Sequence, residues 1–143
     1  MMIGYTAAVL QPIGTAFGIP RGRDSIYLRA IERGVCPREV IFRGNLEGLV
    51  EQSSVPFTLR FHGLLELHAI ELDFSAAEHP TSFVEVVDSQ RVATLRARDH
   101  SAKVKGHRHF ILATYDEVFE VICAGYELTL EAPVVQLLDE GEF

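Results

Sequence analysis

The sequence contains no tryptophan, only two cysteines, and no apolar run long enough to cross a bilayer. A membrane-spanning helix needs about 18 or more apolar residues in succession, so we expect no membrane span. Residues 1–10 lack the basic start of a secretory signal peptide, and the expected location is therefore cytoplasmic. In that reducing compartment Cys36 and Cys123, which both lie among apolar neighbours, should be buried, reduced and unbridged.

Short motifs that would specify a chemistry are also missing. The sequence has no CxxC pair, no phosphate-binding glycine loop, no HExxH motif and no serine nucleophile elbow. We therefore expect a non-enzymatic interaction or regulatory domain that uses no cofactor. Small immunity proteins are an analogy for such a domain, and fold-level analogy alone does not establish a function.

The residues that are present suffice for one well-packed domain. The chain has 143 residues, of which 48% are hydrophobic, and phenylalanine is the main aromatic residue with nine copies. A chain of this length buries about 68–70% of its unfolded surface, so it needs neither a metal nor a disulfide to fold. We expect a single globular domain that spans residues 1–143.

The N-terminal third predicts loop and helix. Residues 11–23 are rich in glycine and proline, which favours a loop. Residues 24–34 carry apolar side chains at helical spacing after a polar cap, and Gly34 stands where helices often end. They predict a short helix. Residues 38–51 are ambiguous, because their two glycines disfavour a long helix.

The rest of the chain predicts strands. Residues 57–62 alternate strictly between apolar and polar, and residues 65–70 form a second run beyond Gly63, which we interpret as a bend, bulge or turn. Further strands are expected at residues 83–87, 110–115, 118–123 and 126–131. The expected fold class is α+β, a mainly antiparallel β-sheet with one or two short N-terminal helices.

Residues 116–124 have two interpretations. A hairpin that turns near Asp116 would make residues 118–123 a strand, separated by a kink at Gly125 from the next strand. A short helix capped at Gly125 would fit the same residues. The β-branched side chains in this segment favour the strand.

The C-terminal half resembles a family of small uncharacterised bacterial proteins. The shared residues are His109-Phe110, Tyr115-Asp116, Val118–Val121, Ala124 and Tyr126–Leu128, with Ser82-Phe83, Val86 and Asp88-Ser89 upstream. The resemblance extends over residues 55–131. It implies no reaction, cofactor or substrate, so it assigns no role to any residue.

Histidines provide the alternative function, a small metal-dependent hydrolase. On a strand His107 and His109 would point to the same side, and His100 lies seven residues upstream as a third candidate ligand for zinc. A solvated basic loop explains the same residues, and we expect no bound metal. His62 and His68 would share a face only if the strand passed Gly63 without a shift.

Two further groups of charged residues are candidate sites. Asp116, Glu117 and Glu120 form an acidic cluster, in which Glu120 has apolar neighbours and is expected to be partly buried and paired with an arginine; general acid–base catalysis is the alternative. Arg21 and Arg23 precede the expected helix, where an anion would bind well, although an exposed loop explains them equally.

Charge is distributed unevenly along the acidic chain, whose net charge is −7. Residues 91–110 hold six Lys or Arg against one Asp, whereas residues 111–143 hold eight acids and no Lys or Arg. The excess of acid makes nucleic-acid binding a poor expectation. If the acidic strands share a sheet, the partner should be a basic protein, contacted by Glu66, Glu127 and Glu131. Solubility is the alternative role of these acids, and homo-oligomer formation is left open.

Overall fold

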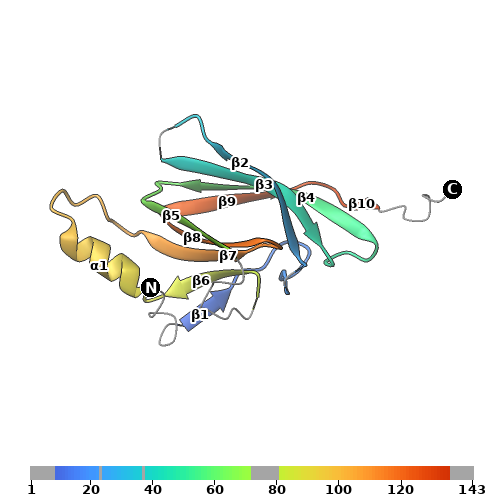
Figure 1. Cartoon of the computed structure of the whole chain (residues 1–143), viewed down its shortest axis with the longest axis horizontal. Coiled ribbons are helices and arrows are strands. Elements are labelled where there is room, and N and C mark those ends of the chain that lie inside the picture. Colours follow the sequence, from blue (N-terminus) through green and yellow to red (C-terminus); the bar gives the residue numbers. More distant parts are fainter. Residues whose placement is uncertain (1–8, 23, 37, 72–80, 136–143) are drawn as a thin grey trace.

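The computed structural model describes residues 9–22, 24–36, 38–71 and 81–135. In these residues two antiparallel sheets pack face to face, and one short helix lies at the end of the molecule (Figure 1). The elements in chain order are β1 (Val9–Pro12), β2 (Ile26–Arg33), β3 (Glu39–Glu47), β4 (Ser53–His62), β5 (Glu66–Glu71), β6 (Phe83–Val87), α1 (Gln90–Arg98), β7 (Arg108–Ala113), β8 (Glu117–Cys123), β9 (Gly125–Leu130) and β10 (Val134–Val135).

The first sheet, here called the β4 sheet, is built on the long β3–β4 hairpin. β2 pairs with β3 on one side, and β9 and β10 both pair with β4 on the other, one after the other along its length. β2 is therefore an edge strand. The second sheet, the β7 sheet, has the order β1-β6-β7-β8-β5.

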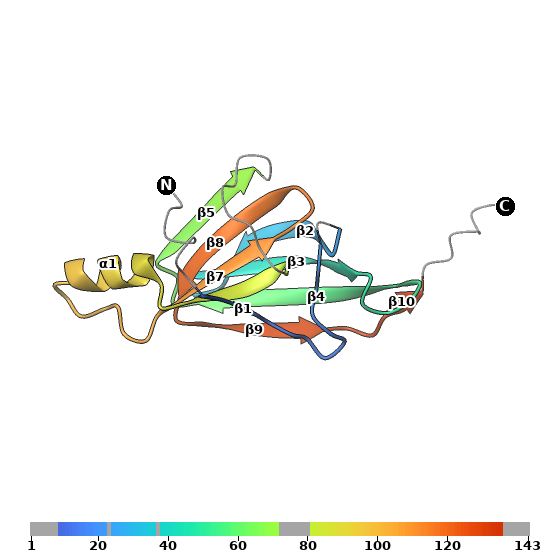
Figure 2. The same ribbon diagram turned by 90° about the horizontal axis from the view of Figure 1, so that it is seen from below.

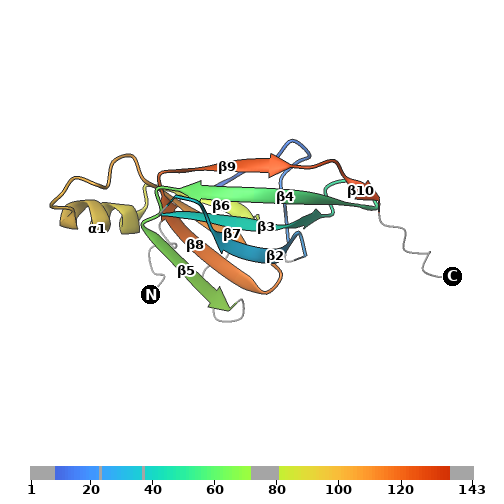
Figure 3. The ribbon, with the colours of Figure 1, turned by 90° about the horizontal axis from the view of Figure 1, so that it is seen from above.

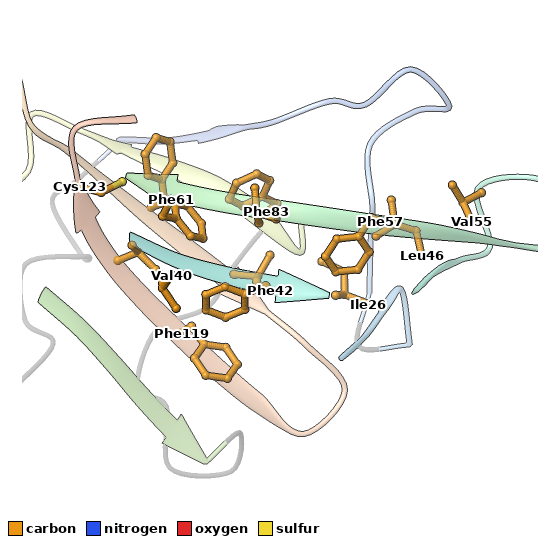
Figure 4. Packing of buried hydrophobic residues seen from close by; sticks show 14 residues of the cluster. Ile26, Val40, Phe42, Leu46, Val55, Phe57, Phe61, Phe83, Phe119 and Cys123 are labelled. Carbon is orange, nitrogen blue, oxygen red and sulfur yellow. The ribbon is translucent and has the colours of Figure 1, made fainter. Parts of the chain in front are cut away.

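The main core fills the space between the two sheets. Its buried phenylalanines come from both layers: Phe42, Phe57 and Phe61 from the β4 sheet, and Phe83, Phe110 and Phe119 from the β7 sheet. Figure 4 shows the ring of Phe119 on β8 beside that of Phe42 on β3, and the two rings meet edge to face with centroids 5.1 Å apart. Such edge-to-face pairs add to the stabilisation from buried apolar area.

The expected fold class, α+β with N-terminal helices, is wrong. The described chain is β-rich, and residues 24–34 contain β2 instead of a helix. A register shift between Leu28 and Ala30 marks a β-bulge, which breaks the alternation of a regular strand. Gly34 does not end a helix either, because its N–H donates to the Glu39 carbonyl at 3.0 Å and continues the ladder with β3.

The ambiguous residues 38–51 are largely β3. Gly44 lies opposite Leu28, and a Cβ atom there would come within 2.1 Å of the Tyr27 carbonyl oxygen. Glycine is therefore required at this point by the close approach of the two backbones, where the sequence alone shows only a residue that disfavours helix.

The strand predictions in the remainder of the chain are mostly confirmed. Residues 57–62 lie in β4, residues 83–87 are β6, and the β7–β8 hairpin turns at residues 114–116, so the strand interpretation of 116–124 is right and the helical one wrong. Gly63, at a φ of 64°, lies between β4 and β5, which belong to different sheets. It therefore marks a change of layer.

Helix α1 lies in the basic segment, for which the sequence favours a solvated loop. Ser89 caps it, because its Oγ accepts a hydrogen bond from the Val92 N–H at 3.1 Å. Only Val92 is buried, so the helix has no apolar stripe from which periodicity could have revealed it. Figures 2 and 3 show α1 extending beyond the end of both sheets.

Candidate functional site

A groove lies between the free edge of β2 and the β7–β8 turn. Its volume is about 320 Å³, and it is lined by residues 27–31 of the edge strand and residues 114–117 of the turn. The two walls come from different sheets. A backbone hydrogen bond attaches the turn to the strand, since the Tyr115 N–H donates to the Ile26 carbonyl at 2.9 Å.

Two stacked tyrosines form one end of this groove. The ring centroids of Tyr27 and Tyr115 are 5.0 Å apart with an interplanar angle of 18°, and the residues are 38% and 39% exposed. Thr114 fixes the turn that presents Tyr115, because its hydroxyl donates to the Glu117 carbonyl at 2.8 Å and accepts from the Glu117 N–H at 3.1 Å. The pair is thus held at the surface by backbone hydrogen bonds.

The electrostatic surroundings of the tyrosines are negative. The pKa of the Tyr27 phenol is raised, first by loss of hydration and then by the nearby Asp24, Tyr115, Glu47 and Asp116. Asp116 and Glu117 line the groove and are exposed. An aromatic face among carboxylates attracts a cation such as the side chain of lysine or arginine. Electrostatics and ring geometry therefore favour the same kind of ligand.

One positively charged side chain also lies in the wall of this groove. Arg29 lines the groove, but its Nε donates to Asn45 Oδ1 at 3.1 Å, across the ladder on β3. The guanidinium is therefore held toward the face of the β4 sheet.

A second polar cluster joins α1 to the β7 sheet. His109 Nδ1 lies 2.7 Å from Ser89 Oγ, and His109 Nε2 lies 3.2 Å from Glu120 Oε1. A serine, an imidazole and a carboxylate in sequence are the parts of a nucleophile–base set. Here Ser89 is only 9% exposed and His109 only 3%, and the serine oxygen also caps the helix. This closed network fits the attachment of α1 better than reaction with a substrate.

The three candidate metal ligands are not brought together. His100 is exposed after α1, His107 Nδ1 accepts from the Lys105 N–H at 3.0 Å, and His109 belongs to the buried network. No group of three or more His, Cys, Asp or Glu among the described residues is placed to hold a metal ion. His107 precedes β7, so the strand geometry that would have aligned it with His109 does not apply.

His62 and His68 do not form a joint site. They are exposed and lie on strands of different sheets, β4 and β5. His68 instead lies near a carboxylate on its own strand, with Nε2 at 3.5 Å from Glu66 Oε1.

The acids expected to contact a partner lie on separate surfaces. Glu66 is on β5 in the β7 sheet, where the Arg91 guanidinium contacts both carboxylate oxygens and lowers the pKa of this group. Glu127 is exposed on β9 in the β4 sheet, opposite Arg60, and Glu131 follows the same strand. The premise that these acidic strands share one sheet is wrong for Glu66.

The acidic cluster divides in a similar way. Asp116 and Glu117 are exposed in the groove, whereas Glu120 is partly buried as expected. Its contact with His109 places it in the network that attaches α1, and its pairing with an arginine stays a prediction.

The anion site predicted at Arg21 and Arg23 required a helix directly after these residues, and the structure has a strand there. Arg21 is exposed, and Arg23 lies outside the described residues. The following element is β2, so the expected helix N-terminus does not exist. Pro20 and Gly22 are instead attached to Ser82, whose N–H donates to the Pro20 carbonyl at 3.0 Å and whose hydroxyl donates to the Gly22 carbonyl at 2.8 Å.

The two cysteines differ in their surroundings. Both are unbridged, as expected. Cys123 is buried, and burial raises the pKa of its thiol to about 12. Cys36 is exposed, so the prediction of two buried thiols is wrong for this residue. It lies just after β2, in the connection to β3.

The comparisons with known proteins add no family. No protein-family model, no curated protein and no solved structure matches this chain. The described part of the chain contains no helix long and apolar enough to cross a membrane. The case for a function therefore depends on the geometry of the groove.

The sequence indicates one wall of this groove and gives no sign of the other. Asp116 and Glu117 were singled out as a cluster and as a turn. Tyr27 was assigned to a helix, and Tyr115 to a central strand. A tyrosine beside an Asp at a predicted turn was a usable signal for an exposed ring, but its stacking partner comes from a strand about 90 residues earlier in the chain.

Proposed function

We propose that this protein is a non-enzymatic, cytoplasmic interaction domain that binds a basic segment of a partner protein in the groove between β2 and the β7–β8 turn. The observation that carries the proposal is the stacked, solvent-exposed pair of Tyr27 and Tyr115 beside Asp116. Large aromatic side chains with one face open to solvent are typical of binding surfaces, since they supply area at little cost in conformational entropy.

The charge of the chain supports a basic ligand at this place. The net charge is −7, so the whole molecule attracts a positive partner from a distance. In the groove Asp116 and Glu117 act at short range, where screening by salt is weaker than over longer distances. Cys36, an exposed free thiol, fits a reducing compartment and hence a cytoplasmic partner.

The test compares two groove variants with two variants of similar charge elsewhere. The probe is a fluorescently labelled lysine-rich peptide, and binding is measured by anisotropy. Tyr115→Ala and Asp116→Lys should each weaken binding, the first through loss of a ring face and the second through charge reversal. Glu127→Lys on β9 and Glu131→Lys just after it are the matched controls for Asp116→Lys, because all three reversals change the net charge by the same amount.

The outcomes separate local recognition from general attraction. If the groove binds the peptide, the β9 reversals lower the association rate slightly at low salt and lose their effect as salt rises, whereas Asp116→Lys weakens binding at both. Equal effects of Asp116→Lys and Glu127→Lys at every salt concentration would show that only the net charge matters. That result would refute the groove as the site.

A further inference from the structure

The groove continues along the free edge of β2, and this edge has a backbone pattern of its own. β2 ends the β4 sheet, so one side of the strand pairs with β3 and the other has no partner strand among the described residues. Exposed sheet edges are templates for the addition of another strand. The binding mode that this edge suggests for the basic segment rests on the proposed function.

Hydrogen bonds at the two ends of β2 show which groups face outward. At the start, the Ser25 carbonyl accepts from the Glu47 N–H at 2.8 Å, so the backbone of Ser25 faces β3 and that of Ile26 and Leu28 faces away. The Ile26 carbonyl confirms this direction, because it accepts from the Tyr115 N–H outside the sheet. The β7–β8 turn therefore closes the edge at Ile26.

At the far end the same reasoning starts from Gly34. Its N–H donates to the Glu39 carbonyl at 3.0 Å, so Gly34 and Glu32 face β3 and the backbones of Ile31 and Arg33 face outward. The β-bulge between Leu28 and Ala30 adds one residue to the strand, and this extra residue explains why even-numbered residues face outward before it and odd-numbered residues after it. An open stretch thus begins beside the turn and runs to Arg33, with the exposed side chain of Ile31 on it (43% exposed).

A second copy of this chain is a poor occupant of the edge. Antiparallel pairing centred on Ile31 would set Arg33 opposite Arg29 of the second copy. Pairing centred on Glu32 would set two glutamates directly opposite each other. Like charges at directly opposed positions are destabilising. The edge therefore suits a different chain better.

We infer that the partner's basic segment binds as an extended strand added to the outer edge of β2. Its backbone hydrogen-bonds to Ile31 and Arg33, and one lysine or arginine side chain reaches the Tyr27–Tyr115 pair and Asp116. Since a strand rises about 3.3 Å per residue, about six residues span the distance from Arg33 to Tyr27. Backbone hydrogen bonds hold the partner's segment against β2, and the groove favours a positively charged side chain on it.

The experiment uses the full chain and a peptide of about eight residues that carries one lysine, placed to reach the Tyr27–Tyr115 pair, and otherwise alternates valine and threonine, so that no lysine lies opposite Arg33. Backbone amide exchange is followed by NMR with and without the peptide. In the free protein the outward amides of Ile31 and Arg33 should exchange fast, whereas those of Ala30 and Glu32 should be protected. At a peptide concentration about ten times the Kd, protection of the two outward amides should rise about tenfold.

Two sets of variants test the backbone contact itself. Ile31→Pro removes an outward N–H, which an edge strand tolerates, and should abolish most binding; Ile31→Ala keeps the N–H and should bind nearly as well as the unaltered protein. Peptides N-methylated on alternate residues leave the protein intact. Methylation in the phase that pairs with β2 should weaken binding about tenfold or more, and methylation in the other phase should not.

The outcomes distinguish this inference from the proposed function. Binding that is lost with Asp116→Lys but indifferent to Ile31→Pro and to N-methylation would keep the groove and overturn strand addition. Binding that depends on N-methylation but not on Asp116 would keep the edge pairing and overturn the basic-ligand function. Failure of the peptide to bind at millimolar concentration, or occupation of β2 by a second copy in sedimentation, would overturn the inference.

Discussion

Truncation of Phe119 tests the packing of the two sheets most directly. Phe119 lies on β8, is only 2% exposed, and meets the ring of Phe42 edge to face across the core. Phe119→Ala removes a buried ring and leaves a cavity that rigid strands on both sides cannot close. Changes of this kind cost about 3–5 kcal/mol in the free energy of unfolding, and loss of the aromatic pair places the expected value in the upper half of that range.

Urea unfolding followed by circular dichroism measures this loss. The midpoint should fall with little change in the slope, since the denatured state is unaltered in its exposed surface. Leu67→Ala is the matched control on the neighbouring strand β5, opposite Val121, where Leu67 is 37% exposed. It should cost less than about 1 kcal/mol. A loss of this small size in Phe119→Ala would mean that the sheets do not pack through this ring.

Two further predictions concern cysteine reactivity and a surface ion pair. In native protein Cys36 should react with a thiol reagent at once, whereas Cys123, with a pKa of about 12 through burial, should react only after denaturant is added; two equally fast thiols would contradict the buried position of Cys123. Glu66→Gln should lower stability at neutral pH, because pairing with Arg91 lowers the pKa of Glu66 in the folded state. That advantage is present above the ordinary pKa of 4.5 and is lost as pH falls through the lower folded value, so unfolding midpoints of the two proteins should converge in acid. A difference that persists at the lowest pH would assign the stabilisation to packing instead.

The strands of the central hairpins could be predicted because their alternation is regular. Residues 57–62 bury every second side chain between the sheets, and β7 and β8 bury apolar side chains on both of their faces, with Glu120 as the exception on β8. Local pattern and tertiary position agree in these segments. The turn near Asp116 follows from the same agreement, since a polar pair interrupts two apolar runs.

The pattern fails at β2 for a specific physical reason. A bulge at Arg29 shifts the phase of the strand, so inward-facing positions do not recur at every second residue. The resulting spacing of Ile26, Ala30 and Ile31 resembles that of a helix. Helix α1 was missed for the opposite reason, because only Val92 is buried and no apolar stripe exists. In both segments tertiary contacts determine the secondary structure, which local periodicity does not predict correctly.

The candidate site was beyond the sequence because it joins two distant segments. Tyr27 is on an edge strand of one sheet, and Tyr115 is on a turn of the other. The two rings meet because the Tyr115 N–H bonds to a carbonyl that the β3 ladder leaves free. No periodicity in the sequence encodes that contact.

The positions of the acids in the two sheets change how the net charge of the chain is interpreted. The net charge suggests one acidic face, but the β4 sheet sets Glu32 3.4 Å from Arg43 and Glu39 3.1 Å from Arg60. In both pairs the two charges cancel much of each other's field at a distance, and the exposed Glu32–Arg43 pair contributes little to stability. The acids that remain effective toward a ligand are those beside an apolar or aromatic wall, since lower local polarity strengthens their attraction. The turn that carries Asp116 has that combination, and the open edge of β2 begins next to it.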